Sequence, residues 1–349
     1  MATLPEARGS CTANSVDGWA SFDERSCRIE AMTAERSPGQ IMLTSNAADV
    51  AALAARWNAL PGSVCHVRDG ANAVYGFRAE GLPFFLRIAE ERHRSRGQLL
   101  AELDFVRFLG SRGLTVIGAV PSNRGEDIES TRTPDGRLWH AVVFATAPGR
   151  KFRYFSRDIN RSLFRMWGSA MGRMHAVSRE YAPGVPVHRP AWHAQDTTCC
   201  TDSMIPATEI SARREFALID EWLESLPRTR ESWGLIHADF ERTNFVRDGA
   251  VLWIYDFDDA CYHWYLADVA HALWAFRDAP AADRKRFLTW FMEGYGRESA
   301  VPDESSEYLS WFVRLRSLCL FMHRQPSNPG DDLRWAQRMR AGFEKPFRW

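Results

Sequence analysis

The sequence predicts an α+β protein of two lobes, in which a smaller strand-rich lobe is followed by a larger helical lobe. Two observations carry this prediction. Between residues 74 and 144, short apolar segments with strand-like composition flank one helical pattern. Beyond residue 150, apolar residues recur mostly at helical spacing. Such segregation of strands from helices is typical of α+β folds, and the cleft between two lobes is the expected ligand site.

The first lobe is predicted over residues 45–144, after a polar and poorly periodic segment, residues 1–44, that we expect to be a tail and partly disordered. Alternating apolar residues indicate the strands, and a 3.6-residue period indicates the helices. The predicted elements are a helix over 47–57, strands over 74–78 and 84–88, a helix over 98–110 and a strand over 141–144.

The second lobe is predicted over residues 145–349, and residues 145–149 are expected to form the hinge. A β-hairpin is predicted between Phe245 and Phe257, with Asp248-Gly249 as its two-residue turn. The other predicted elements are helices along 159–174 and 216–226, and a helix-rich stretch from about 266 to the end that is broken near Pro280, Pro302 and Pro329.

Composition excludes several classes of protein. The 349 residues are 45% hydrophobic and 25% charged, which suits a globular protein with a large core. Because 44 basic and 44 acidic residues cancel, net charge gives no reason to expect binding to nucleic acid or to an anionic membrane. No apolar stretch approaches the ~20 residues of a membrane span. We therefore expect a cytoplasmic protein, and the sequence leaves its oligomeric state open.

The strongest chemical signal lies in residues 235–259. His237, Asp239 and Asn244 have the spacing H-x-D-x-x-x-x-N, and Asp256 closes an apolar strand twelve residues after Asn244. Aspartate and asparagine alone are also common in solvent-exposed turns, which is the alternative explanation. The predicted hairpin between Asn244 and Asp256 makes the pattern much more specific.

These residue types suit phosphoryl transfer from a nucleoside triphosphate. Mg²⁺ must bridge the negatively charged phosphate oxygens, and it prefers hard oxygen ligands, which Asn244 and Asp256 would supply. Asp239, on the same loop as Asn244, would accept the proton of an acceptor hydroxyl and orient it. We expect His237 to brace the loop by hydrogen bonding rather than to act as a base.

Residues 235–245 and 253–259 resemble the catalytic and metal-binding loops of the aminoglycoside phosphotransferase and choline kinase group, the small-molecule branch of the protein-kinase-like fold. The sequence from Asp256 to Ala270 further resembles the subgroup of stress-response kinases and homoserine-kinase-like proteins. The resemblance covers about residues 60–290, and it is weaker in the first half. It implies that Asp268 braces the catalytic loop from a helix.

The resemblance also implies nucleotide contacts from the first lobe. Kinase-like folds hold the α- and β-phosphates with a cation on the third strand, and an acidic residue on the next helix holds that cation. Here the strand offers Arg87, and no lysine occurs before Lys151. The helix offers Glu102 on its apolar face, where a carboxylate needs a partner, so an Arg87–Glu102 pair is predicted. The alternative is a surface arginine and a glutamate at the edge of the apolar stripe.

Two further segments complete the predicted nucleotide site. The loop over the phosphates would be residues 68–73, with Gly70 and Asn72; it lacks G-x-G-x-x-G, and a plain turn is the alternative. The base of ATP, or of GTP, would lie against the hinge backbone at Ala145 and Ala147.

The resulting expectation is an ATP- and Mg-dependent phosphotransferase that phosphorylates a hydroxyl of a small molecule, either an aminoglycoside-like compound or another hydroxylated metabolite. A protein serine/threonine kinase of the stress-response type is the first alternative, disfavoured because the chain lacks an A-P-E element. A nucleotide-binding pseudokinase is the second. The missing lysine favours it, whereas the intact Asp239, Asn244 and Asp256 speak against it.

Overall fold

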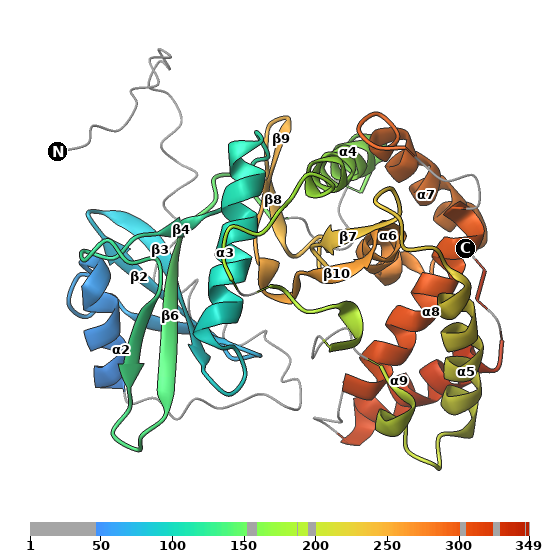
Figure 1. The fold of residues 1–349 in the computed structure, drawn as a ribbon, viewed down its shortest axis with the longest axis horizontal. Helices are drawn as coiled ribbons and strands as arrows, with labels where there is room; N and C mark the ends of the chain where they lie inside the picture. The colour runs from blue at the N-terminus through green and yellow to red at the C-terminus, as the bar shows by residue number, and fades with distance from the viewer. Residues whose placement is uncertain are drawn as a thin grey trace.

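The computed structural model describes residues 47–151, 159–186, 188–194, 200–300, 305–323, 329–345 and 347–348. It confirms the two-lobed α+β fold. A sheet with two helices forms the first lobe, and mostly helices form the second (Figure 1). The predicted tail and the predicted break at Pro302 lie outside the described residues.

The first lobe is built on an antiparallel sheet with the strand order β1-β2-β3-β6-β4, in which β5 also pairs with β6. The long strands β3 and β6 pair from Phe84↔Ala145 to Glu90↔Trp139. The three predicted strands are confirmed as β2, β3 and β6, while the other strands are shorter and were not predicted. The strands are β1 (Cys65–Arg68), β2 (Ala73–Ala79), β3 (Leu82–Glu90), β4 (Ala119–Val120), β5 (Glu129–Arg132) and β6 (Leu138–Ala145).

A helix covers each face of this sheet, because both faces are apolar. Helix α2 (Ala47–Ala54) and the 3₁₀ turn η2 (Ala55–Trp57) pack on one face together with Leu86 and Ile88 of β3. Helix α3 (Arg96–Ser111) packs on the other face through Leu99 and Leu103. Side chains alternate along a strand, so Arg87, between Leu86 and Ile88, points to the α3 side.

The second lobe surrounds a small pair of antiparallel strands with helices. Strands β7 and β10 pair with each other, and β8 and β9 form the predicted hairpin. The elements are α4 (Arg161–Ser178), η3 (Trp192–Ala194), η4 (Asp202–Met204), α5 (Ile210–Ser225), β7 (Trp233–Ile236), β8 (Phe245–Asp248), β9 (Val251–Ile254), η5 (Phe257–Asp259), β10 (Cys261–Trp264), α6 (Tyr265–Leu273), η6 (Trp274–Phe276), α7 (Ala281–Tyr295), α8 (Ser305–His323) and α9 (Pro329–Phe343).

The hairpin turn differs by one residue from the prediction. Asp248 pairs with Val251, so the two-residue turn is Gly249-Ala250 rather than Asp248-Gly249. Gly249 supplies the positive φ, +57°, that the first position of a tight hairpin turn favours. Asp248 therefore stays in the strand, and the prediction had the turn one residue too early.

The chain crosses between the lobes beside strand β8. Gly149 has φ +108°, and a Cβ at this position would lie 2.4 Å from the carbonyl oxygen of Arg247. The next residue, Arg150, exchanges backbone hydrogen bonds with Arg247. Only glycine fits this close approach, so the segment predicted as the hinge is fastened to the second lobe at its end.

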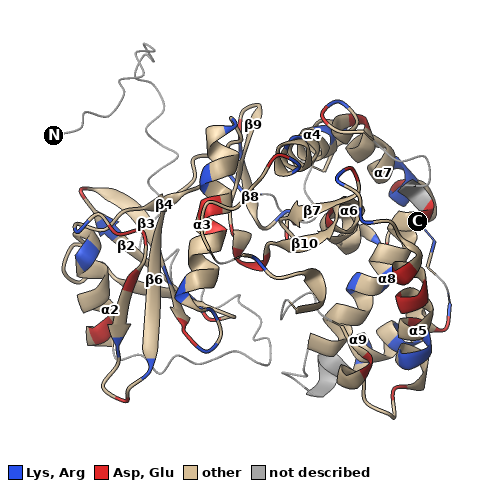
Figure 2. Ribbon diagram, viewed as in Figure 1, with Lys and Arg blue, Asp and Glu red and all other residues tan. Residues whose placement is uncertain are grey.

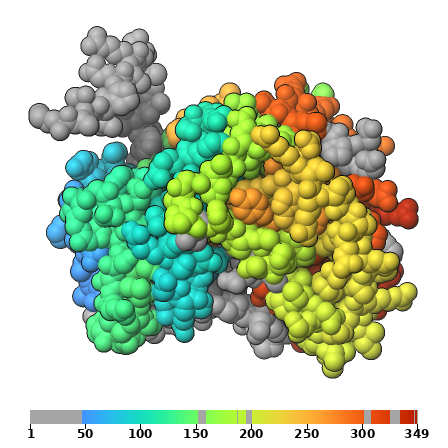
Figure 3. Space-filling model, viewed as in Figure 1, coloured from blue at the N-terminus to red at the C-terminus, as the bar shows by residue number. Residues whose placement is uncertain are grey.

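A second segment, which follows α4, returns over the junction of the lobes, where the yellow-green surface of Figure 3 lies between the two lobes. The Tyr181 hydroxyl donates to Asp104 of α3 at 2.7 Å, and the Gly184 amide donates to the same oxygen at 2.9 Å. Farther along, Arg189 donates to the carbonyl oxygen of Gln98 at 3.2 Å. This segment therefore fixes α3 relative to the second lobe.

Charged residues are distributed over both lobes rather than separated by sign (Figure 2). This distribution agrees with the zero net charge of the sequence. Within the described part of the chain, no helix combines the length and the apolar character needed to span a membrane.

Candidate active site

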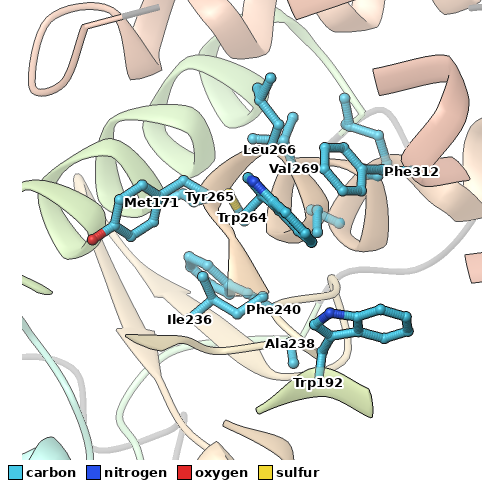
Figure 4. Close-up of a cluster of buried hydrophobic side chains, with 14 of the residues drawn as sticks. Met171, Trp192, Ile236, Ala238, Phe240, Trp264, Tyr265, Leu266, Val269 and Phe312 are labelled. Atoms are coloured by element: carbon cyan, nitrogen blue, oxygen red, sulfur yellow. The ribbon is translucent and has the colours of Figure 1, made fainter. Parts of the chain in front are cut away.

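The predicted catalytic loop begins directly after β7 and rests on the core of the second lobe. Ala238 and Phe240 of this loop are fully buried, and they belong to the same apolar cluster as Trp264, Tyr265 and Val269 (Figure 4). Apolar and polar residues alternate along the loop. The apolar side chains anchor it in the core, and the polar ones are left on the side of the lobe junction.

Asp268 of α6 contacts the backbone of this loop. Its buried carboxylate accepts hydrogen bonds from the amide nitrogens of His237, at 3.1 Å, and Ala238, at 3.0 Å. It also accepts from Nε2 of His175 at 3.1 Å. Burial lowers the pKa of His175 in spite of Asp268, so the ring is neutral and its Nδ1 accepts from the Tyr295 hydroxyl at 2.9 Å.

His237 connects the catalytic loop to the segment that follows β9. Its Nε2 donates to the carbonyl oxygen of Tyr255 at 3.1 Å, and its Nδ1 accepts from the amide of Asp239 at 3.3 Å. Burial lowers the pKa of His237, which favours the neutral ring that this pattern requires. The geometry agrees with a brace and leaves neither ring nitrogen free to act as a base.

The side chains of Asp239 and Asn244 contact each other across the catalytic loop. The Asn244 amide nitrogen donates to Oδ2 of Asp239 at 2.7 Å and to the Asp239 carbonyl oxygen at 2.8 Å. The carboxyl group of Asp239 nevertheless remains 29% exposed. Burial, followed by the neighbouring carboxylate of Glu241, raises the pKa of Asp239, and Asp259 and Asp256 raise it further.

Asp256 lies next to these two residues. The Asn244 carbonyl oxygen accepts from the amide of Tyr255 at 3.1 Å, which aligns the end of β9 with the catalytic loop. Asp256 itself adopts the left-handed conformation, with φ +69°, an uncommon backbone geometry for a non-glycine residue that often marks a functional site. Its Oδ2 accepts from Arg68 at 2.8 Å, and Arg87 lies 3.9 Å from its Oδ1.

The donor set suits a small, hard divalent cation. Because the Asn244 nitrogen is occupied by Asp239, its amide oxygen is the atom left for a metal, and the carboxylate of Asp256 is the second candidate ligand. No group of three or more histidine, cysteine or acidic side chains with metal-binding geometry occurs among the described residues. An amide oxygen and a carboxylate are hard oxygen ligands, which a divalent cation can take together with phosphate oxygens and water.

The predicted Arg87–Glu102 pair forms between β3 and α3. Arg87 Nη2 lies 2.7 Å from Glu102 Oε2, and both side chains are almost completely buried. Although burial opposes the charged form, Glu102 and Asp258 hold the pKa of Arg87 above its ordinary value. The guanidinium also stacks 5.0 Å above the ring of Phe144, next to the hinge.

Residues 68–73 span the end of β1, the turn and the start of β2, and they contact the segment of the predicted metal ligand Asp256. Arg68 contacts Asp256, and the Asn72 side-chain nitrogen donates to Asp258 at 2.9 Å. Gly70 lies in the turn itself, while Ala145 ends β6 and Ala147 follows in the hinge. The structure therefore brings the loop together with the predicted metal ligands.

Three buried arginines were not predicted. Arg94 donates to both carboxylate oxygens of Asp258, at 3.2 and 3.3 Å, and to Asp259 at 3.2 Å. Arg189 donates to the carbonyl oxygens of Ala260, at 2.7 Å, and Asp258. Burial opposes ionisation of Asp258, but Arg94, Arg87 and Arg189 outweigh it and lower the pKa of this carboxyl group to about 2. The third is Arg316 of α8, which donates to Asp239.

His271 is a further brace that the prediction missed. Its Nδ1 contacts the carbonyl oxygen of Ala238 at 2.7 Å, and burial lowers the pKa of the ring well below its ordinary value. A signal was present in the sequence. His271 follows Asp268 by three residues on one helix, so both side chains lie on the same helix face and reach the same loop.

A strand-rich lobe beside a helical lobe, with an H-x-D-x-x-x-x-N loop and a following aspartate at their junction, defines a phosphotransferase of the protein-kinase-like fold. The chain belongs to the phosphotransferase enzyme family, whose model matches residues 63–301.

Two amicoumacin kinases are similar to this chain in sequence, and a third protein shares its fold. The amicoumacin kinase of Bacillus subtilis (strain 168) is 27% identical over 279 residues, which are 78% of this chain and 82% of that protein. A solved amicoumacin kinase in complex with AMP-PNP, Ca²⁺ and Ami is 26% identical, with a TM-score of 0.80 over 87% of this chain and 95% of that one. A microcompartment-associated aminopropanol kinase shares the fold at 21% identity, with a TM-score of 0.70 over 85% of this chain and 95% of that one.

Proposed function

We propose that this protein transfers the γ-phosphoryl group of Mg-bound ATP to a hydroxyl group of a small molecule. One observation carries the proposal. Asp239, Asn244 and Asp256 lie together at the junction of the lobes, beside the buried Arg87–Glu102 pair. The carboxylate for the acceptor and the ligands for the metal are thus adjacent to the cation for the phosphates, as phosphoryl transfer requires.

Each residue then has a distinct role. Asn244 and Asp256 would hold Mg²⁺, which when bound neutralises the phosphate oxygens. Arg87, oriented by Glu102, would contact the α- and β-phosphates beneath the loop that contains Gly70 and Asn72. The nucleotide base would lie against the backbone of Ala145 and Ala147.

Asp239 would receive the proton of the acceptor hydroxyl while the hydroxyl oxygen of the acceptor attacks the γ-phosphorus. His237 and Asp268 would keep the loop in place. Most of the rate enhancement would come from positioning and charge neutralisation. A bidentate arginine differs from a lysine in shape, but it supplies the same positive charge.

The relatives support a small-molecule acceptor. An amicoumacin kinase is similar to this chain over most of its length, and an aminopropanol kinase shares its fold. Amicoumacin and small amino alcohols are therefore the first acceptors to test.

We further propose that the division into lobes at residues 144 and 145 separates phosphate binding from catalysis. A supply of ATP and Mg²⁺ would place the activity in the cytoplasm.

The test measures ADP release and product mass with a panel of acceptors. Purified protein is incubated with Mg·ATP or Mg·GTP and with amicoumacin, 1-amino-2-propanol, hygromycin B, spectinomycin or a generic protein. We expect turnover of a small molecule, loss of that turnover in Asp239→Ala and after EDTA treatment, and recovery when Mg²⁺ is added back. Asp248→Ala is the matched control, because Asp248 is exposed in the nearby hairpin and should leave the rate unchanged.

Other outcomes would support the alternatives. Labelled protein bands without small-molecule products would indicate a protein kinase. Tight ATP binding without turnover of any acceptor would indicate a pseudokinase. Equal turnover by wild type and Asp239→Ala would contradict the assigned catalytic residue.

A further inference from the structure

Helix α8 places a buried arginine directly against the catalytic carboxylate. Arg316 is only 5% exposed, and its Nη2 lies 3.2 Å from Oδ1 of Asp239 and 3.5 Å from Oε1 of Glu241. Asp239 keeps 29% of its side chain exposed. The guanidinium therefore lies behind the carboxylate, whose other side remains open to an acceptor.

The buried charge of Arg316 needs acceptors, and among the described residues the catalytic loop supplies its ion-pair partners. A buried guanidinium is costly unless carboxylates or other acceptors compensate it. Within the described residues, the ion pairs of Arg316 are those with Asp239 and Glu241, and its Nε finds no acceptor. Its interactions are thus concentrated on the loop that carries the chemistry.

Arg316 and Asn244 together fix the plane of the Asp239 carboxyl group. Asn244 donates to Oδ2 at 2.7 Å, and Arg316 donates to Oδ1 at 3.2 Å. With one donor on each oxygen, the carboxylate cannot rotate without losing a charge-assisted hydrogen bond. Arg316 also lies between two carboxylates of like charge, Asp239 and Glu241, and so stabilises their close approach.

Helix α8 is packed against its neighbours on both sides of Arg316, at Phe312 and at Ser317. One turn earlier, Phe312 packs edge-on against His263 and tilted against Trp264, with ring centroids 5.7 and 6.0 Å away (Figure 4). Ser317, which follows Arg316 directly, accepts a hydrogen bond from the Trp274 indole at 2.9 Å. Position 316 also lies beyond residue 301, where the match to the family model ends.

We propose that Arg316 is a positioning residue that acts through Asp239 and holds its carboxylate toward the acceptor hydroxyl. This inference rests on the proposed function. In the step concerned, the acceptor O–H bond breaks and its proton passes to Asp239. The bond from the acceptor oxygen to the γ-phosphorus forms, the bond from that phosphorus to the bridging oxygen breaks, and ADP leaves. Arg316 exchanges no proton, and its ion pairs are with Asp239 and Glu241.

Arg314 provides a matched control on the same helix. It is 8% exposed, and it pairs with the buried Glu215 of α5 through two contacts of 2.6 and 2.7 Å, with no contact to the catalytic loop. Truncating Arg314 leaves the buried carboxylate of Glu215 without its partner, and truncating Arg316 removes a buried, ion-paired side chain, so both changes destabilise the fold. Only the change at Arg316 should affect the rate of the folded enzyme.

The experiment compares Arg316→Ala, Arg316→Lys and Arg314→Ala with wild type. It measures kcat and KM with Mg·ATP and amicoumacin, the rate of ATP hydrolysis without an acceptor, and the dissociation constant of ADP. We expect Arg316→Ala to lower kcat by about 10- to 100-fold, a part of the 10²–10⁴-fold that a positioned base contributes. KM for ATP and ADP affinity should stay within about twofold, since Arg316 touches no nucleotide-binding residue. Arg316→Lys should recover part of kcat, and Arg314→Ala should lower the melting temperature with kcat unchanged.

The two proposals fail in different ways. If wild type turns over no acceptor and hydrolyses no ATP, the proposed function is wrong. If wild type is active and Asp239→Ala is not, but Arg316→Ala retains the wild-type kcat, Arg316 is only structural and the inference is overturned. Equal losses of kcat in Arg316→Ala and Arg314→Ala would also overturn it. Should Arg316→Ala not fold, the comparison of Arg316→Lys with Arg314→Lys decides, because only the former should lose kcat.

Discussion

A single alanine shows how the catalytic loop keeps an unfavourable backbone shape. Ala238 has φ +64°, which costs a non-glycine residue of order 1 kcal/mol or more. Both of its backbone polar groups bind one helix, because its amide donates to Asp268 and its carbonyl oxygen contacts His271. Helix α6 therefore holds the strained residue that aims Asp239, one position later, at the junction of the lobes.

The substitution Asp268→Asn tests this arrangement. An amide has one acceptor oxygen and two donor hydrogens, so it cannot serve the amides of His237 and Ala238 and the ring of His175 at once. We expect the free energy of unfolding to fall by about 3 kcal/mol, as for other broken buried networks. We also expect kcat to fall, because the strained loop relaxes. Urea unfolding and initial rates measured well below the melting temperature check the two effects separately.

The control for this change is Asp104→Asn. Asp104 also accepts two hydrogen bonds, from Tyr181 and Gly184, but it lies on α3, away from the catalytic loop. One oxygen of Asp104 accepts both bonds, and the amide oxygen of an asparagine can do the same, so this variant should change stability and kcat little. A wild-type kcat in Asp268→Asn would mean that the loop holds its shape without α6.

At the scale of elements, helices α4 and α7 approach each other more closely than ordinary side chains permit. A Cβ on Gly168 would lie 1.9 Å from the carbonyl oxygen of Phe291, and one on Gly294 would lie 2.0 Å from that of Arg165. Glycines on both helices allow this contact. The Trp167 indole of α4 donates to the Phe240 carbonyl oxygen at 3.0 Å. The helix pair therefore contacts the backbone of the catalytic loop.

Gly168→Ala should therefore be strongly destabilising. The added methyl group meets backbone rather than a flexible side chain, so α4 and α7 must move apart, at a cost of about 3 kcal/mol. Gly110→Ala in α3 is the opposite case. Its new Cβ would meet only a Val116 methyl group at 3.6 Å, and alanine favours the helix by about 0.5–1 kcal/mol. Chemical denaturation of both variants measures the difference, and similar stabilities would refute the close-packing explanation.

At the scale of the whole molecule, the sequence predicted those contacts of the site that join residues close together in the chain. The catalytic loop and Asp256, two residues after the end of β9, are joined by the hairpin of β8 and β9, so their spacing alone indicated their proximity. Arg87 and Glu102 lie 15 residues apart on consecutive elements, and the apolar position of Glu102 required a partner. Such signals are local, and for that reason a single sequence reveals them.

The arginines at the junction of the lobes could not be predicted, because their partners are distant in sequence. Arg94 and Asp258 are separated by 164 positions, and Arg316 and Asp239 by 77. In a chain with so many arginines, nothing local distinguishes these from the exposed ones. Their roles emerge only when α3, the segment after α4 and helix α8 pack around the same acidic loops.

Packing also leaves four histidines neutral inside the second lobe. Burial lowers the pKa of each ring below its ordinary value, and that of His263 falls to about 3, with further contributions from Arg228 and His193. The four are His175, His237, His263 and His271. The unfolded chain exposes these rings and protonates them below about pH 6.5. The molecule should thus lose stability in mild acid.

The sign and size of this effect can be measured at His263, which contacts neither the catalytic loop nor the candidate metal ligands. Its pKa is lowered in the folded state, so below about pH 6.5 the unfolded state binds one more proton than the folded state. Its contribution to stability is complete above that pH. It is lost by about 1.4 kcal/mol per pH unit as the pH falls towards 3.

His263→Asn keeps an oxygen acceptor near the position of Nδ1, which accepts from the Trp264 amide at 2.9 Å, and removes the titrating group. Both proteins are unfolded with urea at pH 7.5 and at pH 5.0. Wild type should lose about 2 kcal/mol more than the variant over this interval, because 1.5 pH units lie below the unfolded pKa. Between pH 7 and 8 the two should differ by a constant, which reflects lost packing alone. The opposite result would be that the free energies of unfolding of wild type and variant fall equally between pH 7.5 and pH 5.0. His263 would then bind its proton equally in the folded and unfolded states, and the second lobe would not hold it as a neutral ring.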